Sequence, residues 1–289
     1  MAHLAFLGTG LLGGAFAEAA AKRGDTVSAW NRSPRKVQAL AQFGVKPAAT
    51  PADAVRGAAR VHLVLKDDAV VEEVIAAARP ALSRDAVIVD HTTTLPKLTA
   101  QRSQRLNGEG LKYLHCPVFM GPPAARKAAG TMLACGPGAV FDSVKDELAK
   151  MTGRIEYLGE RPDLAAVEKL FGNAMIIGVS AVLADVLTIA QASDVPGEEA
   201  IKLLGLLDLN AMVSGRGGNM AKGNFTPTFE LAMARKDLRL MIESSGNRPL
   251  AALPAIAARM DQLIAEGHGA KGTSVLGIDA VAGTQPPKP

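Results

Sequence analysis

The chain contains little cysteine and few aromatic residues. Cys116 and Cys135 are the only cysteines in 289 residues, which excludes the disulfide framework of a small secreted domain. Aromatic residues make up 4% of the chain, too few for the stacking platforms that bind single-stranded nucleic acids. The 32 basic and 28 acidic residues give a net charge of +4, and they are dispersed. We therefore expect no nucleic-acid partner.

We also expect neither a metal site nor a secretory leader. The N-terminus has no basic residues ahead of its apolar run, which we interpret as the first strand of a cytoplasmic protein. One mostly apolar run, residues 174–192, contains Asp185. A charge there is costly in lipid, so we expect a helix buried between domains or subunits and no membrane partner. We predict no metal site, because no ligand spacing links the five histidines, which are His3, His62, His91, His115 and His268.

A glycine-rich turn near the N-terminus is the most informative feature that is present. A predicted strand at residues 3–8 runs into Gly8-Thr9-Gly10-Leu11-Leu12-Gly13, a G-x-G-x-x-G pattern. The first glycine permits a tight turn, the second lets the backbone approach a pyrophosphate, and the third lets helix pack on strand. The helix expected next, to Lys22, would direct its N-terminal N–H groups and dipole at that anion. The pattern predicts a dinucleotide site.

The second predicted strand, residues 26–30, indicates which dinucleotide binds. In NAD-binding units a carboxylate about 20 residues after the glycines binds the ribose 2′-hydroxyl. This chain has Asn31-Arg32-Ser33 there, with Arg35 and Lys36 close behind. Because guanidinium pairs strongly with phosphate, we expect Asn31, Arg32, Ser33 and Lys36 to contact a 2′-phosphate, and NADP(H) is favoured over NAD(H). A solvated helix start would also explain these charges.

Strand and helix signals alternate along the first 162 residues. The expected strands are 3–8, 26–30, 61–65, 86–90, 112–116, 131–135 and 155–158. The expected helices are 12–22, 34–42, 51–56, 69–78 and 140–150. This alternation predicts an α/β fold with a mostly parallel, doubly wound sheet of the Rossmann type. Ligand contacts are expected at the carboxyl ends of the strands, in loops 65–68, 90–94 and 116–123.

Strand signals stop after Pro162, and the remaining pattern is helical. We expect helices at 163–192, 197–206, 228–245 and 250–266. The predicted organisation is an NADP-binding domain at 1–162, an all-α substrate and dimerisation domain at 163–282 that begins with a long interdomain helix, and a disordered tail at 283–289.

Lys169 and Asn173 are the candidate chemical groups of that long helix. They are four residues apart, so they share one face. Apolar neighbours would lower the pKa of the lysine, which suits proton transfer near neutral pH. Asn173 would hold the ammonium or a substrate oxygen. When Lys169 is considered alone, an ordinary lysine that extends to water is the simpler interpretation.

The order of these motifs resembles the β-hydroxyacid dehydrogenase superfamily, which includes 3-hydroxyisobutyrate dehydrogenase, 6-phosphogluconate dehydrogenase, glyoxylate/succinic semialdehyde reductases and imine reductases. The matching segments cover nearly the whole chain, in the order 8–13, 31–33, 90–96, 116–118, 130–131, Lys169…Asn173 and 236–238. The resemblance implies a Rossmann domain, an all-α domain and a homodimer through interlocked C-terminal helices. It also implies hydride transfer between NADP(H) and a small aldehyde, ketone or β-hydroxyacid.

The resemblance also implies roles for individual residues. Lys169 matches the catalytic lysine and Asn173 its partner, and Thr92 and Thr93 match a Ser-Thr pair beside the nicotinamide and substrate. Lys236 matches a lysine that reaches the cofactor site, supported by Asp237, although an exposed charged pair is the simpler interpretation of these two alone. The further cofactor contacts expected in the loop after residues 61–65 are Leu65 and Lys66.

The expected substrate loop departs from the family pattern. Where the family reads D-A-P-V-S-G-G and holds a carboxylate, this chain reads His115-Cys116-Pro117-Val118-Phe119-Met120-Gly121, with an insertion around 122–127. We expect the substrate contacts in this loop to be Val118, Phe119, Met120 and Gly121. The pocket is then more apolar, which puts small hydroxy acids in doubt. Arg126 or Lys127 as a replacement anion contact, and His115 as a second proton donor, are hypotheses with simpler structural explanations.

The sequence thus predicts an NADPH-dependent reductase of a small-molecule carbonyl substrate, with Lys169 as general acid. One alternative is an imine reductase or reductive aminase on the same fold. The family carries Asp or Tyr at the position of Lys169 in those enzymes, which argues against it, while the apolar Phe119-Met120 pair argues for it. A non-catalytic NADP-binding protein is a second alternative, and the presence of Lys169 argues against it.

Overall fold

The computed structural model describes residues 2–281. The chain divides into two compact units, one extending to Ala174 and the other starting at Met175. This division lies inside one long helix, whereas the sequence prediction placed the domain boundary after residue 162. The predicted tail at 283–289 lies outside the described residues.

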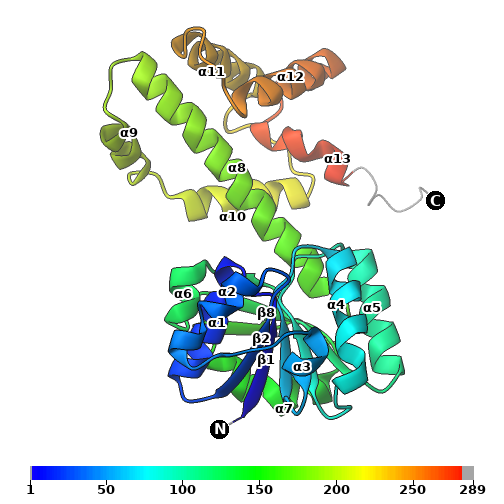
Figure 1. Cartoon of the computed structure of the whole chain (residues 1–289). Coiled ribbons are helices and arrows are strands. Elements are labelled where there is room, and N and C mark those ends of the chain that lie inside the picture. Colours follow the sequence, from blue (N-terminus) through cyan, green and yellow to red (C-terminus); the bar gives the residue numbers. More distant parts are fainter. Residues whose placement is uncertain (1, 282–289) are drawn as a thin grey trace, which may run out of the picture. The chain divides into compact units, whose positions relative to one another are not determined.

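A six-stranded sheet forms the centre of the N-terminal unit (Figure 1). Every neighbouring pair of its strands is parallel. The spatial order is β3-β2-β1-β4-β5-β6, which is the doubly wound order and confirms the predicted fold class. The chain reverses direction across the sheet between β1 and β4, so a ligand crevice is expected there. The strands are β1 His3–Leu7, β2 Thr26–Trp30, β3 Lys46–Pro47, β4 Arg60–Leu63, β5 Val87–Asp90 and β6 Lys112–His115.

Both faces of this sheet are buried, because side chains alternate between two cores along each strand. In β1, Phe6 packs in a core with α1 and α7, and Leu7 packs in a second core with α3 and α4. Helices therefore cover both faces, as Figure 1 shows. The helices of this unit are α1 Leu11–Lys22, α2 Pro34–Gln38, α3 Pro51–Val55, α4 Asp68–Ala78, α5 Pro96–Gly108, α6 Pro122–Arg126 and α7 Gly138–Ala149.

A second sheet, with three strands, follows the first. Its strands are β7 Val118–Phe119, β8 Thr131–Ala134 and β9 Arg154–Tyr157, in the order β7-β8-β9. The sequence prediction placed the strands at 131–135 and 155–158 in the main sheet, and this was wrong. Pro117 follows β6 and cannot donate to a ladder, and a single bridge between His115 and Cys135 is the only pairing between the sheets recorded for the described residues.

The C-terminal unit is helical, as predicted. Its elements are α8 Leu164–Ala192, which starts in the N-terminal unit, α9 Gly197–Leu204, α10 Leu209–Ala221, α11 Leu231–Ser244, α12 Leu253–Leu263 and α13 Ile278–Val281. Asp185 of α8 is buried and accepts backbone N–H bonds from Ala251, Ala252 and Leu253 at 2.5–2.9 Å. Burial raises the pKa of this carboxyl, but the three N–H bonds outweigh it and the net pKa is lowered.

The apolar run of α8 is exposed rather than buried within the chain. Ile177 is 68% exposed and Met175 52% exposed. Within residues 2–281, α8 is the one helix long and apolar enough to cross a membrane, and 6% of its most apolar stretch is buried. The sequence analysis expected this helix to be buried between domains or between subunits, and the exposure within its own unit leaves that expectation a prediction. Burial against a second subunit is taken up below.

Several elements were absent from the sequence prediction. The expected helix at 34–42 ends at Gln38 and is followed by a short 3-10 turn. The helices α5 and α10 were not expected. Large apolar residues at helical spacing are few in α5, and α10 contains Gly215, Gly217 and Gly218, which disfavour a helix, so the signal for both helices is weak.

Candidate functional site

The glycine turn between β1 and α1 has the geometry that a dinucleotide requires. Gly8 has a φ of +99°, and a Cβ there would overlap the Val64 carbonyl oxygen, while a Cβ on Gly13 would overlap the Gly8 carbonyl oxygen. Among the described residues, no heavy atom lies within 4 Å of a Cβ built on Gly10. The first and third glycines are therefore needed by the fold, and the second leaves open space.

The N-terminus of α1 faces this open space. No side chain caps the helix, so its first N–H groups are available to an anion. Leu11, the first residue of α1, is 85% exposed, while Leu12 is half-buried and packs on the core. An uncapped helix start beside an open glycine is a site for a phosphate group.

A cavity of about 340 Å³ adjoins the turn, between the ends of β1, β2 and β4. It lies at the carboxyl edge of the sheet, where the strand order predicts a ligand. The predicted cofactor residues that line it are Gly8, Gly10, Asn31, Arg32, Ser33, Lys36, Leu65 and Lys66. Trp30 also lines it. A second hollow of about 230 Å³ is lined by Thr9, Leu11, Lys36 and Arg126 among others.

Asn31 connects the glycine turn to the segment after β2. Its side-chain oxygen accepts a hydrogen bond from the Thr9 N–H at 3.0 Å, and its Nδ2 donates to the Ser33 carbonyl at 3.1 Å. Arg32, Ser33 and Lys36 are exposed. In the described part of the chain neither Arg32 nor Lys36 has an ion-pair partner, so both cations are free for a ligand.

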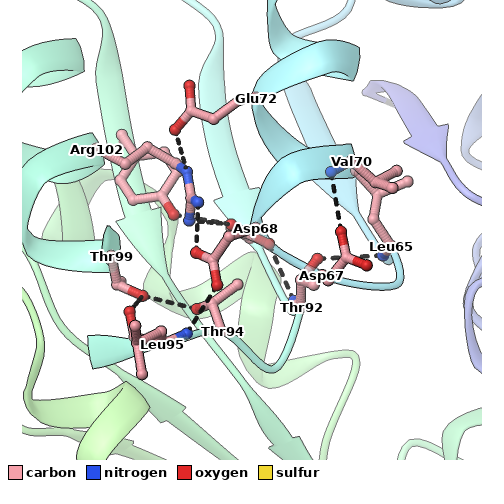
Figure 2. Close-up of polar contacts among 12 residues, drawn as sticks. Leu65, Asp67, Asp68, Val70, Glu72, Thr92, Thr94, Leu95, Thr99 and Arg102 are labelled. Atoms are coloured by element: carbon pink, nitrogen blue, oxygen red, sulfur yellow. Dashed lines mark hydrogen bonds and ion pairs between the residues drawn. The ribbon is translucent and has the colours of Figure 1, made fainter. Parts of the chain in front are cut away.

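Thr92 and Thr93 follow β5 and have different environments. Thr92 is buried, and its N–H donates to Asp90 at 2.9 Å. Its hydroxyl accepts from the Leu65 N–H at 3.1 Å (Figure 2). Thr93 is exposed. The structure therefore uses Thr92 to join the loops after β4 and β5, and it leaves the Thr93 side chain open.

A buried arginine, which the sequence analysis missed, holds the same two loops in place. The Arg102 guanidinium has no exposed surface; it lies 2.6 Å from Asp68, 2.8 Å from Glu72 and 3.6 Å from Asp90. Asp68 also accepts the Leu95 N–H at 2.9 Å, as Figure 2 shows. Burial raises the pKa of Asp90 despite these contacts. The acidic pair Asp67-Asp68 after β4 was the one signal in the sequence for a buried cation. Its partner Arg102 lies in α5, a helix that was not expected.

The histidines of the sheet are structural. His91 Nδ1 lies 2.7 Å from the Cys116 carbonyl, which can only accept, so Nδ1 donates and Nε2 accepts from His62 Nδ1 at 3.0 Å. Burial lowers the pKa of His91 to about 4 and that of His115 to about 3. His115 is 1% exposed, and both its burial and its lowered pKa argue against the hypothesis that it is a second proton donor. No group of three metal-ligating side chains gathers within residues 2–281.

Lys169 lies against residues 118–119 of the loop that the sequence analysis expected to bind substrate. Its Nζ donates to the Val118 carbonyl at 2.7 Å and stands 4.0 Å from the centre of the Phe119 ring. The residue is 9% exposed, and burial lowers the pKa of its ammonium. No carboxylate among the described residues forms an ion pair with it. Asn173, one turn further along α8, is half-buried.

The remaining predicted residues are placed as follows. Met120 is half-buried and Gly121 is exposed, at the end of β7. Arg126 of α6 pairs through Nε with Glu18 of α1 at 2.8 Å and lines the hollow that Thr9 and Leu11 also line, and its role as an anion contact stays a hypothesis. Lys236 lies in the C-terminal unit, where it forms an exposed ion pair with Asp237 at 2.6 Å.

The sequence and the fold are similar to those of known oxidoreductases. The family model described as the NAD binding domain of 6-phosphogluconate dehydrogenase matches residues 3–159. An uncharacterized oxidoreductase of Shewanella frigidimarina is 28% identical over 94% of each chain. Glyoxylate/succinic semialdehyde reductase 1 of Arabidopsis thaliana is 25% identical over 89% of each. A reductive aminase of Aspergillus terreus, solved with NADPH and ethyl levulinate, superposes with a TM-score of 0.87 at 24% identity, over 97% of this chain and 99% of that one.

Proposed function

Because the chain belongs to the family of the 6-phosphogluconate dehydrogenase NAD-binding domain, we propose that it is an NADPH-dependent reductase of a carbonyl carbon with Lys169 as general acid. It is an oxidoreductase of the hydroxyacid dehydrogenase and imine reductase group, with a Rossmann-like domain followed by a helical region. The choice of NADPH, the role of the lysine and the substrate class are argued below from this chain's own residues.

The preference for NADPH rests on the segment after β2. Arg32 and Lys36 line the cavity and have no ion pairs in the described part of the chain, and no acid stands in the segment 31–36. A 2′-phosphate would receive two cations and the Ser33 hydroxyl, whereas a 2′-hydroxyl would find no carboxylate to bind. The open space at Gly10 and the uncapped start of α1 fit a pyrophosphate.

The position of Lys169 carries the proposal. NADPH, when bound, supplies a hydride to the carbonyl carbon. The Lys169 ammonium would donate its proton to the oxygen of that carbonyl, and its charge would stabilise the developing alkoxide. Its hydrogen bond to the Val118 carbonyl holds Nζ at the substrate loop. In the reverse direction the neutral amine would accept the hydroxyl proton, and Asn173 would orient either the amine or the substrate oxygen.

The imine reductase alternative draws support from one observation. The side chain at position 119 is an aromatic ring beside the lysine, and an apolar loop suits imines that carry no carboxylate. A lysine at position 169 argues against it, since a cation disfavours an iminium substrate at the same place. A non-catalytic NADP-binding protein remains a weaker candidate, because it would need neither the lysine nor its lowered pKa.

We also propose a homodimer formed through the C-terminal helices. Apolar side chains are exposed on α8 and α10, including Ile177 at 68% and Val213 at 55%. Large apolar side chains exposed in such number are typical of an interaction surface. A cytoplasmic dimer, with no membrane or nucleic-acid partner, explains this surface together with the charged Asp185 inside α8. Light scattering at micromolar concentration should give twice the mass of one chain.

The experiment that separates the functions is NADPH consumption with a panel of aldehydes, ketones, short keto acids and cyclic imines. Turnover of carbonyl compounds above imines would support the proposed reductase. Preferred turnover of cyclic imines would support the imine reductase instead. NADPH binding without turnover of any compound would support the non-catalytic protein.

A further inference from the structure

The Phe119 ring is fixed against α8 by a glycine. A Cβ built on Gly172 would overlap the ring of Phe119, so the ring sits in a notch that only glycine leaves open. The ring also packs against a small buried cluster formed by Leu133, Cys135 and Ala165. Residues of β8 and of α8 therefore set the position of the ring together.

This ring forms one wall around the proposed proton donor. Lys169 Nζ is held 4.0 Å from the ring centre and 2.7 Å from the Val118 carbonyl oxygen. An ammonium is attracted to the face of an aromatic ring, so the two contacts together fix where the proton is delivered. A carbonyl oxygen that accepts this proton has to lie beside Phe119. The group next to that carbonyl then meets an apolar surface.

The surrounding loop has few donors for an anion. The side chains at 118–121 are apolar or absent, and α6 begins with Pro122 and Pro123, neither of which has an N–H. Of the two cations in the insertion, Arg126 pairs through Nε with Glu18 at 2.8 Å and Lys127 is exposed to solvent, so neither is buried in the loop. A carboxylate brought to this loop would lose its hydration and find few hydrogen bonds in return.

We infer that Phe119, seated in the Gly172 notch, selects carbonyl substrates that present an uncharged, apolar group to the loop rather than a carboxylate. The inference rests on the proposed reductase function and names the substrate class of that site. Phe119 acts here by excluding a charged group and by packing on an apolar one. Gly172 acts through Phe119, because it sets the position of the ring.

The test compares succinic semialdehyde with its methyl ester, two aldehydes that differ in the carboxylate charge. For the wild-type protein with NADPH, kcat/KM should be higher for the ester, by about tenfold or more, because the acid loses charged hydrogen bonds. Phe119→Ser supplies a hydroxyl and removes the ring, and should lower this preference by about tenfold. Phe119→Leu stays apolar without a donor and should keep it. Fluorescence of Trp30 with added NADPH serves as the check that each variant is folded.

A second set of variants tests the notch. Gly172→Ala should lower kcat/KM for the ester in the wild-type background, because the added methyl displaces the ring. The same substitution in the Phe119→Ser background should have little effect, since the ring is gone. Equal losses in both backgrounds would contradict the role of the notch.

The outcomes separate the inference from the function it rests on. A wild-type preference for succinic semialdehyde over the ester, or an unchanged ratio in Phe119→Ser, would overturn the inference alone. Failure to reduce either aldehyde while NADPH still binds would count against the proposed function, and the inference would fall with it.

Discussion

Arg32 is the residue whose removal should best separate NADPH from NADH. It lines the cavity beside the glycine turn and has no protein partner in the described part of the chain. Replacing it with alanine removes one charge-assisted contact to a 2′-phosphate. A hydrogen bond to a charged group contributes about 1.5–3 kcal/mol. Because Arg32 is exposed, solvent screens the contact, and we expect the lower end, about a tenfold rise in the Kd for NADPH.

The assay is quenching of Trp30, which is the only tryptophan and lines the same cavity. NADPH and NADH are titrated separately into the wild type, Arg32→Ala and the matched control Arg35→Ala, which changes an exposed arginine outside the cavity. Arg32→Ala should weaken NADPH and leave NADH unchanged, and Arg35→Ala should leave both unchanged. An equal loss for the two cofactors, or no loss for NADPH, would refute the assignment of the 2′-phosphate to Arg32.

Three further predictions concern the proton donor, the loop support and the glycine turn. Burial lowers the pKa of Lys169, and the protonated form is the acid. As pH rises through this lowered pKa, kcat/KM for reduction should therefore fall and kcat/KM for oxidation should rise. A pH profile with its inflection at or above the ordinary pKa of lysine would contradict this prediction. Arg102→Met removes a fully buried cation from its acidic partners and should lower the free energy of unfolding in urea by about 3 kcal/mol. Arg105 is an exposed ion-pair partner of Glu72, and the control Arg105→Met should change that free energy by less than about 1 kcal/mol. Gly10→Ala should weaken NADPH binding without altering the unfolding midpoint, because the added Cβ meets no described atom. Gly8→Ala should destabilise the fold, because its Cβ overlaps Val64. Similar unfolding midpoints for the two variants would argue against the different roles of these glycines.

The local parts of this structure could be predicted from the sequence. The glycine turn depends on residues that are adjacent in the chain, and the alternation of strands and helices led to the observed strand order. The lowered pKa of Lys169 was also foreseeable, since its neighbours on α8 are apolar. These features require only local spacing and the rules of parallel sheets.

The features that were missed depend on contacts between distant segments. Arg102 can be buried because it forms ion pairs with Asp68 and Asp90. The sequence around Arg102 gives no sign of these partners, which are distant in the chain. The small sheet was placed wrongly because alternating residues predict a strand without saying which sheet it joins. The contact between Gly172 and Phe119 joins α8 to β7, and it became visible only when the two were placed together.

The exposure of the apolar run in α8 could not be predicted from the sequence either. A run of apolar residues in a sequence predicts burial, but it does not distinguish the core of one chain from the surface between two chains. The structure of one chain shows that the run is exposed after Met175. The charge on Asp185 does find its partners in the same chain, at the start of α12.

Lys169→Met tests the central claim most directly, with turnover and NADPH affinity measured on the same sample. The matched control is Lys145→Met, which removes an exposed lysine of α7 that pairs with Asp142. Loss of proton transfer should lower kcat for carbonyl reduction by about 10²–10⁴-fold, with the Kd for NADPH unchanged and with Lys145→Met as active as the wild type. Unchanged turnover in Lys169→Met, or a loss of NADPH affinity that accounts for the loss of activity, would contradict the role of Lys169 as general acid.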